Sequence, residues 1–573
     1  MMKKGIIKTL AFGAIIALAF TACNDQWNEH NQVKEELNST ETLWDIISKK
    51  GELSEFASML KRTGYDKLLQ QNRYYTIWAP KNGFGYTEDN DSLLQVEFVE
   101  NHIADYRYNA SGILNENQVR MINNKYIFFD GAGNDYTFKG KKLVTKNIPA
   151  KNGVLHIIDG YANFTANIWE QLAKVDSLSE INSFLKSYNI NYFDEASSVQ
   201  GPIVNGQITY LDSVVVLQNE WFNYIGYLAR EDSSYYMIAP TNKAWREMYQ
   251  KALTYFIYPS TKFGGDSLQR INAASAMCRH LVFSRAANGL KVIDDPRTKD
   301  SLSSNWYMTR HSSFPNKVTF RGDEYKNLFN NLVEMDELSN GKLYVTDTYN
   351  FDPIKCWHDT IKIEGEDMIN IEVTENSTLR DVKSIPRDSV NIYRHVSRGS
   401  YGEFYPKNAS GNAKLTVTIN KVLSAPYLVK CVFVPPTILD KTAVFQQNLM
   451  NLQLKYVDEA GKVKTLNMKT PYQWYDEKEK AFNSNFADSC YNKLDTVVFL
   501  PQTDEARSFF RFPTNEYDLS SSEIAQTQLI IQSNMSSKDK AHDRHIRIDC
   551  IILEPIDEET FVDPYPYNQG EGE

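Results

Sequence analysis

An internal repeat limits the fold of this chain more than any other feature of its sequence. Three short blocks occur twice in the same order between residues 75 and 347. The first copy has YTIWAPKNGF (75–84), NHIA (101–104) and NGVLHIID (152–159). The second copy has YMIAPTNKAW (236–245), RHLV (279–282) and NGKLYVTD (340–347). An ordered repeat of this kind predicts two related structural modules.

The blocks themselves predict local structure. Residues 75–80 form an apolar run that ends at Pro80, which is typical of a buried strand stopped by a residue that cannot donate to a sheet. Asn152-Gly153 predicts a turn that opens a second buried strand. Amphipathic helical patterns precede each copy, at residues 42–47 and 53–60 and at residues 168–172 and 181–188. Each copy is therefore expected to be an α+β module.

These motifs resemble those of fasciclin-like domains. The resemblance is carried by TIWAPKNGF and MIAPTNKAW, by His102 and His280, and by NGVLHIIDGYANF and NGKLYVTDTYNF. It covers a little over half of the chain and implies one module at residues 39–163 and a second, with insertions, at residues 164–351. The second copy has about 35 additional residues before Pro240.

The resemblance implies adhesion and binding at cell surfaces, and no catalytic residues carry over because the family has no shared active site. The three histidines of the motifs, His102, His156 and His280, have apolar neighbours. We expect each of them to hold local geometry by a hydrogen bond to a backbone carbonyl, since this is the common role of a buried histidine.

The C-terminal third has a different pattern. From about residue 352, short alternating apolar segments are separated by Gly, Pro, Asn and Asp, and almost no helical period appears. Eight such segments predict an antiparallel β-sandwich, similar to the jelly-roll modules of surface lipoproteins, over residues 352–573. The expected segments are 360–364, 368–373, 414–423, 427–434, 452–456, 496–500, 528–532 and 545–553. The fold class is thus α+β: two fasciclin-like modules followed by an all-β sandwich with an acidic tail.

The N-terminus is typical of an exported protein. Lys3 and Lys4 precede an apolar stretch at residues 10–20, so residues 1–22 are expected to be a signal peptide. The run Phe20-Thr21-Ala22-Cys23 resembles a bacterial lipobox, in which Cys23 receives the lipid. Residues 23–38 then form a polar tether. The expected location is the outer membrane of a Gram-negative bacterium, on its cell-surface or its periplasmic face. The alternative is a soluble secreted protein whose cleavage site happens to precede a cysteine.

Charge argues against nucleic acid as a partner. The formal charge is −10, and removal of residues 1–22 takes away three lysines and no acid, which changes it to −13. Phosphate binding requires clustered Lys and Arg, and no Lys/Arg run in the mature chain exceeds two residues. The chain also lacks CxxC pairs, so neither a structural zinc site nor another metal or cofactor is expected.

Aromatic residues are the candidate binding groups. They make up 13% of the chain, which suits either β-rich cores or surfaces that bind ligands by stacking. Five of them lie in segments of the C-terminal third that contain many turn residues, and these are the candidates for contact with sugar rings or peptide side chains. They are Tyr401, Tyr405, Tyr472, Trp474 and Tyr475. The alternative for each of them is core packing or loop anchoring.

Two functional classes remain open at this stage. The sequence lacks HExxH, GxSxG, P-loop and GxGxxG motifs, so a non-catalytic binding protein is favoured. Its ligand could be a glycan, a peptide or an envelope protein. By analogy with lipoproteins of similar layout, it would accompany a SusC/SusD-like nutrient uptake complex. The alternative is a surface hydrolase with its site in the C-terminal domain.

Overall fold

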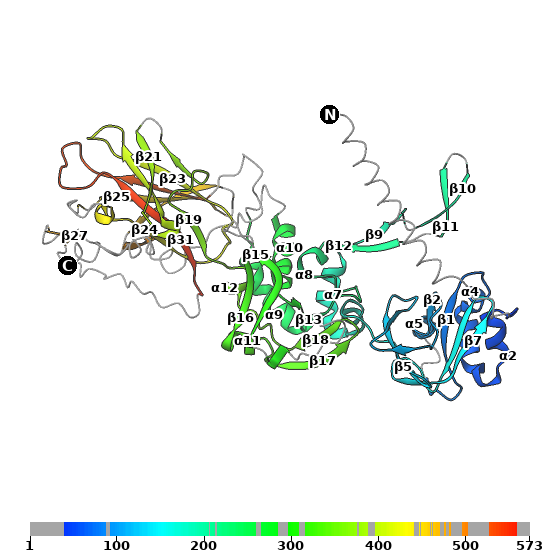
Figure 1. The fold of residues 1–573 in the computed structure, drawn as a ribbon. Coiled ribbons are helices and arrows are strands. Elements are labelled where there is room, and N and C mark those ends of the chain that lie inside the picture. Colours follow the sequence, from blue (N-terminus) through cyan, green and yellow to red (C-terminus); the bar gives the residue numbers. More distant parts are fainter. Residues whose placement is uncertain are drawn as a thin grey trace, which may run out of the picture. The chain divides into compact units, whose positions relative to one another are not determined.

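The computed structural model separates the chain into two compact units, residues 1–166 and residues 167–573, and each is described by itself (Figure 1). The expected signal peptide (residues 1–22), the candidate lipidation site Cys23, the expected tether and the acidic residues 558–573 lie outside the described residues. The structure describes residues 39–86, 92–196, 198–204, 207–212, 215–258, 265–284, 296–298, 300–308, 316–374, 377–387, 396–439, 446, 448–458, 460, 462–469, 475–476, 481–482, 495–501 and 527–557. Within these ranges, no helix has both the length and the apolar character needed to cross a membrane.

The first unit combines short helices with one eight-stranded sheet in the order β2-β1-β8-β7-β6-β5-β3, in which β4 also pairs with β5. Its helices are α2 (Leu43–Lys49), α3 (Ser54–Thr63), α4 (Tyr65–Leu68) and α5 (Ser92–Glu100). Its strands are β1 (Tyr75–Pro80), β2 (Ile103–Asp105), β3 (Ile113–Leu114), β4 (Gln118–Arg120), β5 (Tyr126–Ala132), β6 (Asp135–Phe138), β7 (Lys141–Ala150) and β8 (Gly153–Ile158).

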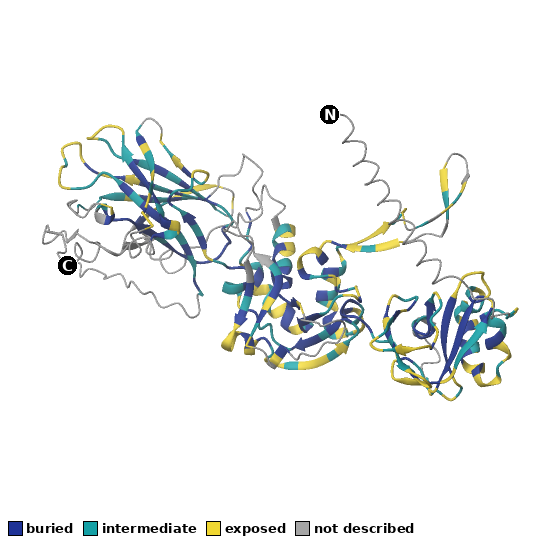
Figure 2. Ribbon diagram, viewed as in Figure 1, coloured by how far each residue is buried: buried dark blue, intermediate teal, exposed yellow. Residues whose placement is uncertain are grey.

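The centre of this unit is the parallel pair β1 and β8, which are formed by the first and last blocks of the repeat. Their register runs from Tyr75 opposite Gly153 to Pro80 opposite Ile158. Every residue of both strands is buried (Figure 2). Ile77 belongs to the core that also contains residues of helices α2, α3 and α5, whereas the next residue, Trp78, belongs to the core on the other face of the sheet. This burial on both faces explains why both blocks are almost continuously apolar.

Asn152, immediately before β8, connects three separate segments of the module by hydrogen bonds. The Asn152 Oδ1 accepts a hydrogen bond from the backbone N–H of Leu43 at 2.8 Å. Its Nδ2 donates to the carbonyls of Leu69 and Gln71 at 2.8 and 2.9 Å. The next residue is Gly153, where an added Cβ would lie 1.9 Å from the Tyr75 carbonyl oxygen, so only glycine permits this close approach of the two strands.

The second unit begins with the same arrangement. Strand β13 pairs in parallel with β18 in the register Tyr235 opposite Gly341 to Pro240 opposite Thr346. The helices of this part are α6 (Ile168–Lys174), α7 (Ser179–Lys186), α8 (Phe222–Ile225), α9 (Asn242–Leu253), α10 (Gly265–Cys278), α11 (Gly322–Asn327) and α12 (Pro353–Cys356). The strands of its main sheet, in the order β16-β15-β14-β13-β18-β17, are β13 (Tyr235–Pro240), β14 (Val282–Ser284), β15 (Ser301–Met308), β16 (Asn316–Arg321), β17 (Leu332–Leu338) and β18 (Gly341–Thr346).

The insertion in the second copy forms β-structure of its own. Two antiparallel pairs project from the body of the unit as a ribbon (Figure 1). Their strands are β9 (Asn189–Phe193), β10 (Val199–Val204), β11 (Gln207–Asp212) and β12 (Val215–Asn219). Strand β9 pairs with β12, and β10 pairs with β11.

From Ile361 onward, the regular structure of the described residues is strand, apart from short 3-10 helices at Ser397–Gly399 and Pro436–Ile438. Eleven strands join in one sheet, β20-β23-β30-β25-β26-β29-β24-β31-β22-β21, with β19 also paired to β31. They are β19 (Ile361–Glu364), β20 (Ile371–Val373), β21 (Thr378–Ser384), β22 (Ser400–Pro406), β23 (Lys414–Ile419), β24 (Tyr427–Phe433), β25 (Met450–Val457), β26 (Val463–Lys469), β29 (Asp495–Pro501), β30 (Thr527–Ser533) and β31 (Ile546–Pro555). A separate short hairpin consists of β27 (Tyr475–Asp476) and β28 (Ala481–Phe482).

Each of the eight predicted segments contains a strand, but three details of the expectation are wrong. The segment expected at 414–423 is shorter, because strand β23 ends at Ile419. Residues 368–370 precede β20 as a turn, and Ile369 is 88% exposed there. The segment of Tyr401 and Tyr405 is strand β22 and not a turn-rich loop. The arrangement of these strands as a sandwich, and the domain limits at residues 163 and 351, stay predictions.

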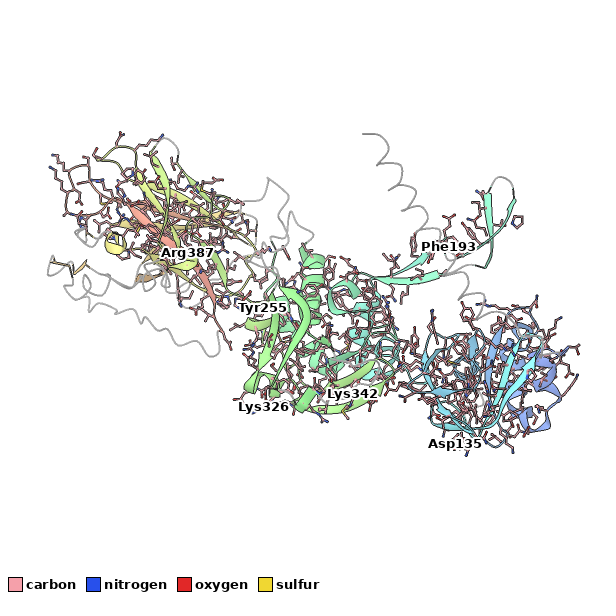
Figure 3. All side chains as sticks on the ribbon, viewed as in Figure 1. Asp135, Phe193, Tyr255, Lys326, Lys342 and Arg387 are labelled. Atoms are coloured by element: carbon pink, nitrogen blue, oxygen red, sulfur yellow. The ribbon has the colours of Figure 1, made fainter. Side chains whose placement is uncertain are left out.

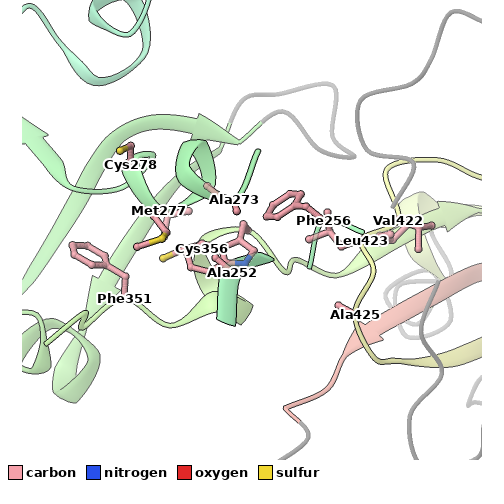
Figure 4. Packing of buried hydrophobic residues seen from close by; sticks show 14 of the residues in the cluster. Ala252, Phe256, Ala273, Met277, Cys278, Phe351, Cys356, Val422, Leu423 and Ala425 are labelled. Atoms are coloured by element: carbon pink, nitrogen blue, oxygen red, sulfur yellow. The ribbon is translucent and has the colours of Figure 1, made fainter. Parts of the chain in front are cut away.

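A continuous apolar core joins the two parts of the second unit. Phe256 from the helical part and Leu423 from the C-terminal part are fully buried members of one cluster (Figure 4). The backbone N–H of Ser424 donates to the carbonyl of Tyr255 at 2.9 Å, and Tyr255 lies where these two parts meet (Figure 3). The His358 ring packs edge-on against the ring of Tyr427 at 4.7 Å.

Candidate functional site

The histidine of the first module's central block is a structural residue. His102 lies between α5 and β2 and is completely buried. Its Nδ1 donates to the carbonyl of Phe98 at 2.7 Å, and its Nε2 accepts from the N–H of Ala162 at 2.9 Å. Burial lowers the pKa of His102 to about 4, so the ring is neutral at pH 7. Both nitrogens are therefore occupied in holding residue 162 against α5.

The other two histidines of the motifs have the same kind of environment. His156 donates from Nε2 to the carbonyl of Tyr108 at 2.9 Å and accepts from the N–H of Asn147 at 3.2 Å. Burial lowers its pKa to about 4. His280 contacts the Cys356 carbonyl through Nε2 at 2.9 Å and the Ser304 hydroxyl through Nδ1 at 2.8 Å. All three make the backbone hydrogen bonds expected from the sequence, and none faces solvent.

Of the five candidate aromatic residues, Tyr401 is a core residue. It is 3% exposed and packs in a small cluster with Ile385, Val396, Val434 and Ile438. Burial raises the pKa of its hydroxyl to about 12. Its ring has no face open to a ligand. Tyr472 and Trp474 lie outside the described residues, and Tyr475 is described only as the first residue of β27.

Tyr405 lies at a charged surface of the C-terminal sheet. Its ring stacks on the ring of His545 with centroids 5.0 Å apart and an interplanar angle of 12°. Its hydroxyl donates to a carboxylate oxygen of Asp381 at 3.3 Å. Both Tyr405 and His545 remain partly exposed. An aromatic ring that is fixed on one side and bordered by hydrogen-bonding groups suits recognition of a polar ligand.

The charged groups around this ring form a row across three strands. Asp381 of β21 lies opposite Glu403 of β22, which lies opposite Arg547 of β31. Glu403 contacts the Nε of Arg547 at 2.8 Å and the Nδ1 of His545 at 3.0 Å. Lys383 reaches Asp381 at 3.0 Å and Glu403 at 3.7 Å. We call these six side chains the ionic row: Asp381, Lys383, Glu403, Tyr405, His545 and Arg547.

The row holds Glu403 as a carboxylate. Burial alone would raise its pKa, but the hydrogen bond with His545 and the charges of Arg547 and Lys383 outweigh it and lower the pKa to about 2. Arg547 is also paired with Asp543. The arrangement is therefore a set of fixed, mutually compensated charges, which can donate to and accept from a ligand.

A second polar cluster lies where β19 and β22 share one edge of β31. Strand β22 pairs with residues 546–548 of β31, and β19 pairs with residues 550–553. At the joint, Gly365 and Gly402 approach so closely that a Cβ on Gly402 would lie 2.1 Å from the Gly365 carbonyl oxygen. Three carboxylates gather near this joint with two cations, and we call the set the carboxylate junction: Lys362, Glu364, Glu366, Arg398 and Asp549.

Two carboxyl groups of this junction have raised pKa values. Asp549 is 3% exposed and accepts from the N–H of Ser397 at 2.8 Å. Burial raises its pKa to about 6 despite that hydrogen bond. Burial also raises the pKa of Glu366. Glu364 is paired with Lys362 at 3.3 Å and with Arg398 at 3.4 Å.

The sequence offers Tyr405 as a candidate but does not indicate its neighbours in the structure. Alternation within β22 places residues 401, 403 and 405 on one face, and the buried Phe404 on the other. That alternation was the available signal for Glu403. No sequence pattern indicated that Arg547 and His545 would lie beside it, because the pairing of β22 with β31 joins residues far apart in the chain.

The comparisons with known proteins give one family assignment. Residues 51–161 match the family model described as the Fasciclin domain. No curated protein matches the chain.

Two of the solved structures that match the chain show weak likenesses to it. A FAS1 domain pair from the insect cell adhesion molecule Fasciclin I is 15% identical with a TM-score of 0.19, over 53% of this chain and 99% of that chain. The enzymatically active domain of tailspike protein 4 from bacteriophage CBA120 is 9% identical with a TM-score of 0.18, over 33% of this chain and 20% of that chain. Neither of these two likenesses supports an assignment of fold or function. The family model assigns a fasciclin domain to residues 51–161, inside the first of the two modules expected from the repeat.

Proposed function

We propose that this protein is a non-catalytic binding protein, held on the outer membrane by lipid at Cys23. In this proposal residues 39–163 and 164–351 are two fasciclin-like modules of an adhesion type, and residues 352–573 form a β-sandwich that carries the ligand site. The domain match at residues 51–161 supports the first module. The identical register of β1–β8 and β13–β18 supports the second.

One observation carries the non-catalytic assignment. The histidines that the two modules share, His102 and His280, are buried and have both ring nitrogens in hydrogen bonds with other residues of the same compact unit. A general acid or base must reach the proton that it transfers. Neither histidine meets this condition, so both support a role in structure.

The ionic row is the proposed ligand site. Tyr405 offers part of an aromatic ring, and Asp381, Lys383 and His545 border it with donors and acceptors. Stacking and hydrogen bonding of this kind suit a glycan, a peptide or a polar patch of an envelope protein. The analogy with lipoproteins of similar layout suggests that the protein delivers such a ligand to a SusC/SusD-like uptake complex.

A retention assay tests the binding role. The purified mature protein is incubated with pooled polysaccharides and peptides, and both bound ligand and released product are measured. We expect retention without product, and at least a tenfold loss of affinity in Tyr405→Ala. Tyr224→Ala is the matched control, because Tyr224 is 47% exposed on the same unit but lies outside the ionic row. Equal retention by both variants would exclude the ionic row as the site.

The anchor requires its own test. Cys23→Ala should move the protein from the outer-membrane fraction to the soluble fraction. Retention of this variant in the membrane would contradict the lipoprotein assignment. Proteins that co-purify after gentle solubilisation of the membrane then show whether a transporter is the partner.

A surface hydrolase is the second candidate, and the carboxylate junction is the observation that favours it. Asp549 has a pKa near 6, in the range of a general acid, and Glu364 nearby is held as an ion pair. Asp549 is 3% exposed, so this candidate also requires a rearrangement that lets a substrate reach the carboxyl group. If the protein is a hydrolase, the same incubation gives reproducible product, and Asp549→Asn abolishes it. The binding proposal fails in that case.

A further inference from the structure

The ribbon inserted in the second unit has no counterpart in the first unit and no role in the proposed function. Strands β9 and β12 form its base, with Phe193 opposite Val215 and Tyr192 opposite Val216. Phe193 lies on this ribbon, away from the body of the unit (Figure 3). Leu217 of β12 packs against the core of the unit, but the large apolar residues nearer the turn of this pair are exposed.

Both faces of the β9–β12 pair present apolar side chains to solvent. Directly opposite residues of an antiparallel pair lie on the same face. One face carries Ile190, Tyr192 and Val216, which are 65%, 53% and 41% exposed. The other face carries Phe193 and Val215, which are 37% and 58% exposed. A continuous set of exposed apolar residues on a monomer marks a surface that another molecule covers.

The ribbon is weakly supported along its length but firmly fixed at its base. Within the described residues, β9 and β12 each pair with one strand only, so each leaves one edge without a partner. A two-stranded pair of this kind is marginally stable in water. At the base, Asn219 is buried and donates to the carbonyl of Leu185 and to Asn189, both at 2.8 Å. The N–H of Trp221 donates back to Asn219 at 2.9 Å. These hydrogen bonds fix the orientation of the β9–β12 pair relative to the body of the second unit.

The negative charge of the ribbon favours some binding partners over others. Its charged residues are Asp194, Glu195 and Asp212, and residues 187–229 contain neither Lys nor Arg. Natural sheet edges are often protected by lysine, and this edge lacks that protection. A second copy would bring three acids against three acids, and an anionic membrane surface would repel the ribbon in the same way.

We propose that the β9–β12 pair is a docking arm for a partner protein with an apolar surface bordered by Lys or Arg. The partner covers the face of Ile190, Tyr192 and Val216, and its cations pair with Asp194 and Glu195 at the end of β9. Burial of the exposed apolar face provides most of the affinity, and the ion pairs with the two acidic residues provide specificity for the partner. This inference does not depend on the ionic row or on the lipid anchor.

Site-specific photo-crosslinking of the full-length protein in its own cells tests the arm. The photoreactive amino acid p-benzoylphenylalanine replaces Tyr192, and the attachment site on any adduct is found by mass spectrometry. We expect an adduct with a different protein, at an apolar segment flanked by Lys or Arg. Reversal of charge in the double variant Asp194→Lys, Glu195→Lys should lower the adduct yield at least fivefold.

Val333 provides the matched control position. It is 60% exposed on β17 of the same unit, and the same photoreactive group there should give background yield only. An equal yield at Val333 overturns the proposal. Adducts with lipid or with a second copy of the chain also overturn the proposal. A crosslinked partner segment without Lys or Arg overturns it as well, and so does an adduct yield that is unchanged in the charge-reversed variant. The thermal unfolding of the second unit is compared between variants, so that a folding defect is not mistaken for lost docking.

Discussion

Asn152 and Asn340 occupy the same position in the two repeated modules and make the same three hydrogen bonds. Each accepts from the first residue of a module's opening helix, Leu43 or Ile168. Each also donates to two carbonyls of the loop that leads to the first central strand. The two modules are therefore related by specific side-chain contacts as well as by sequence.

Loss of this asparagine should destabilise its module strongly. Asn152→Ala leaves one buried N–H and two carbonyls without their partner, which costs roughly 2–4 kcal/mol. Asn152→Asp should be at least as damaging, because a carboxylate would face the two carbonyls. Asn134→Ala, at an exposed position of the same unit, should change stability by less than about 0.5 kcal/mol. Chemical denaturation of the three variants checks the prediction, and equal stabilities would contradict it.

Gly153 should tolerate no side chain. An added Cβ would lie 1.9 Å from the Tyr75 carbonyl oxygen, and the same distance separates a Cβ at Gly341 from the Tyr235 oxygen. Gly153→Ala must push β1 and β8 apart, and we expect a loss of about 3–5 kcal/mol. Gly51→Ala is the control, since no atom lies within 4 Å of a Cβ placed there. Thermal unfolding measures the difference.

The buried histidines should make the first unit sensitive to mild acid. His102 and His156 have folded-state pKa values of about 4, below the ordinary value of 6.5. The unfolded state therefore binds more protons between pH 6.5 and pH 4, and stability falls as the pH falls through this window. Each histidine should lower the free energy of unfolding by up to about 3 kcal/mol as the pH falls through this window. The Tm of the first unit, measured from pH 7 to pH 4.5, should drop less steeply in His102→Gln.

Asp549 should change the stability of the second unit with pH in the opposite direction to the two histidines. Its folded-state pKa of about 6 lies above its ordinary value of 3.8, so the folded state binds the extra proton between these values. Stability of the second unit falls as the pH rises from about 4 to about 6. Asp549→Asn keeps an acceptor for the Ser397 N–H and removes the ionisation, so it should raise stability at pH 7 by about 1–3 kcal/mol. A variant that is less stable than the parent at pH 7 would contradict this sign.

The sequence predicted the elements that depend on local pattern. The apolar runs ending at Pro80 and Pro240 are the buried strands β1 and β13, and the turn at Asn152-Gly153 opens β8 as expected. In each case the side-chain period or a turn residue carries the information.

The partners of the candidate site depend on long-range pairing, which a local pattern does not encode. The sequence marks Tyr405 as a candidate, but the stacking of its ring on His545 follows from the register of β22 against β31. Tyr401 was grouped with it because both are aromatic. The satellite cluster that buries Tyr401 includes Val434 and Ile438, which follow β24, and sequence spacing gives no sign of that contact.

The hydrogen bonds of Asn152 and Asn340 also affect when each repeat can fold during synthesis of the chain. The hydrogen bond from Leu43 to Asn152 spans 109 residues, and its counterpart from Ile168 to Asn340 spans 172. A module whose first helix is tied to its last strand completes its folding only after that strand has been synthesised. Contacts of such long range slow folding. If the chain is exported as we propose, this delay favours translocation, because neither repeat can complete its fold before its final strand is available.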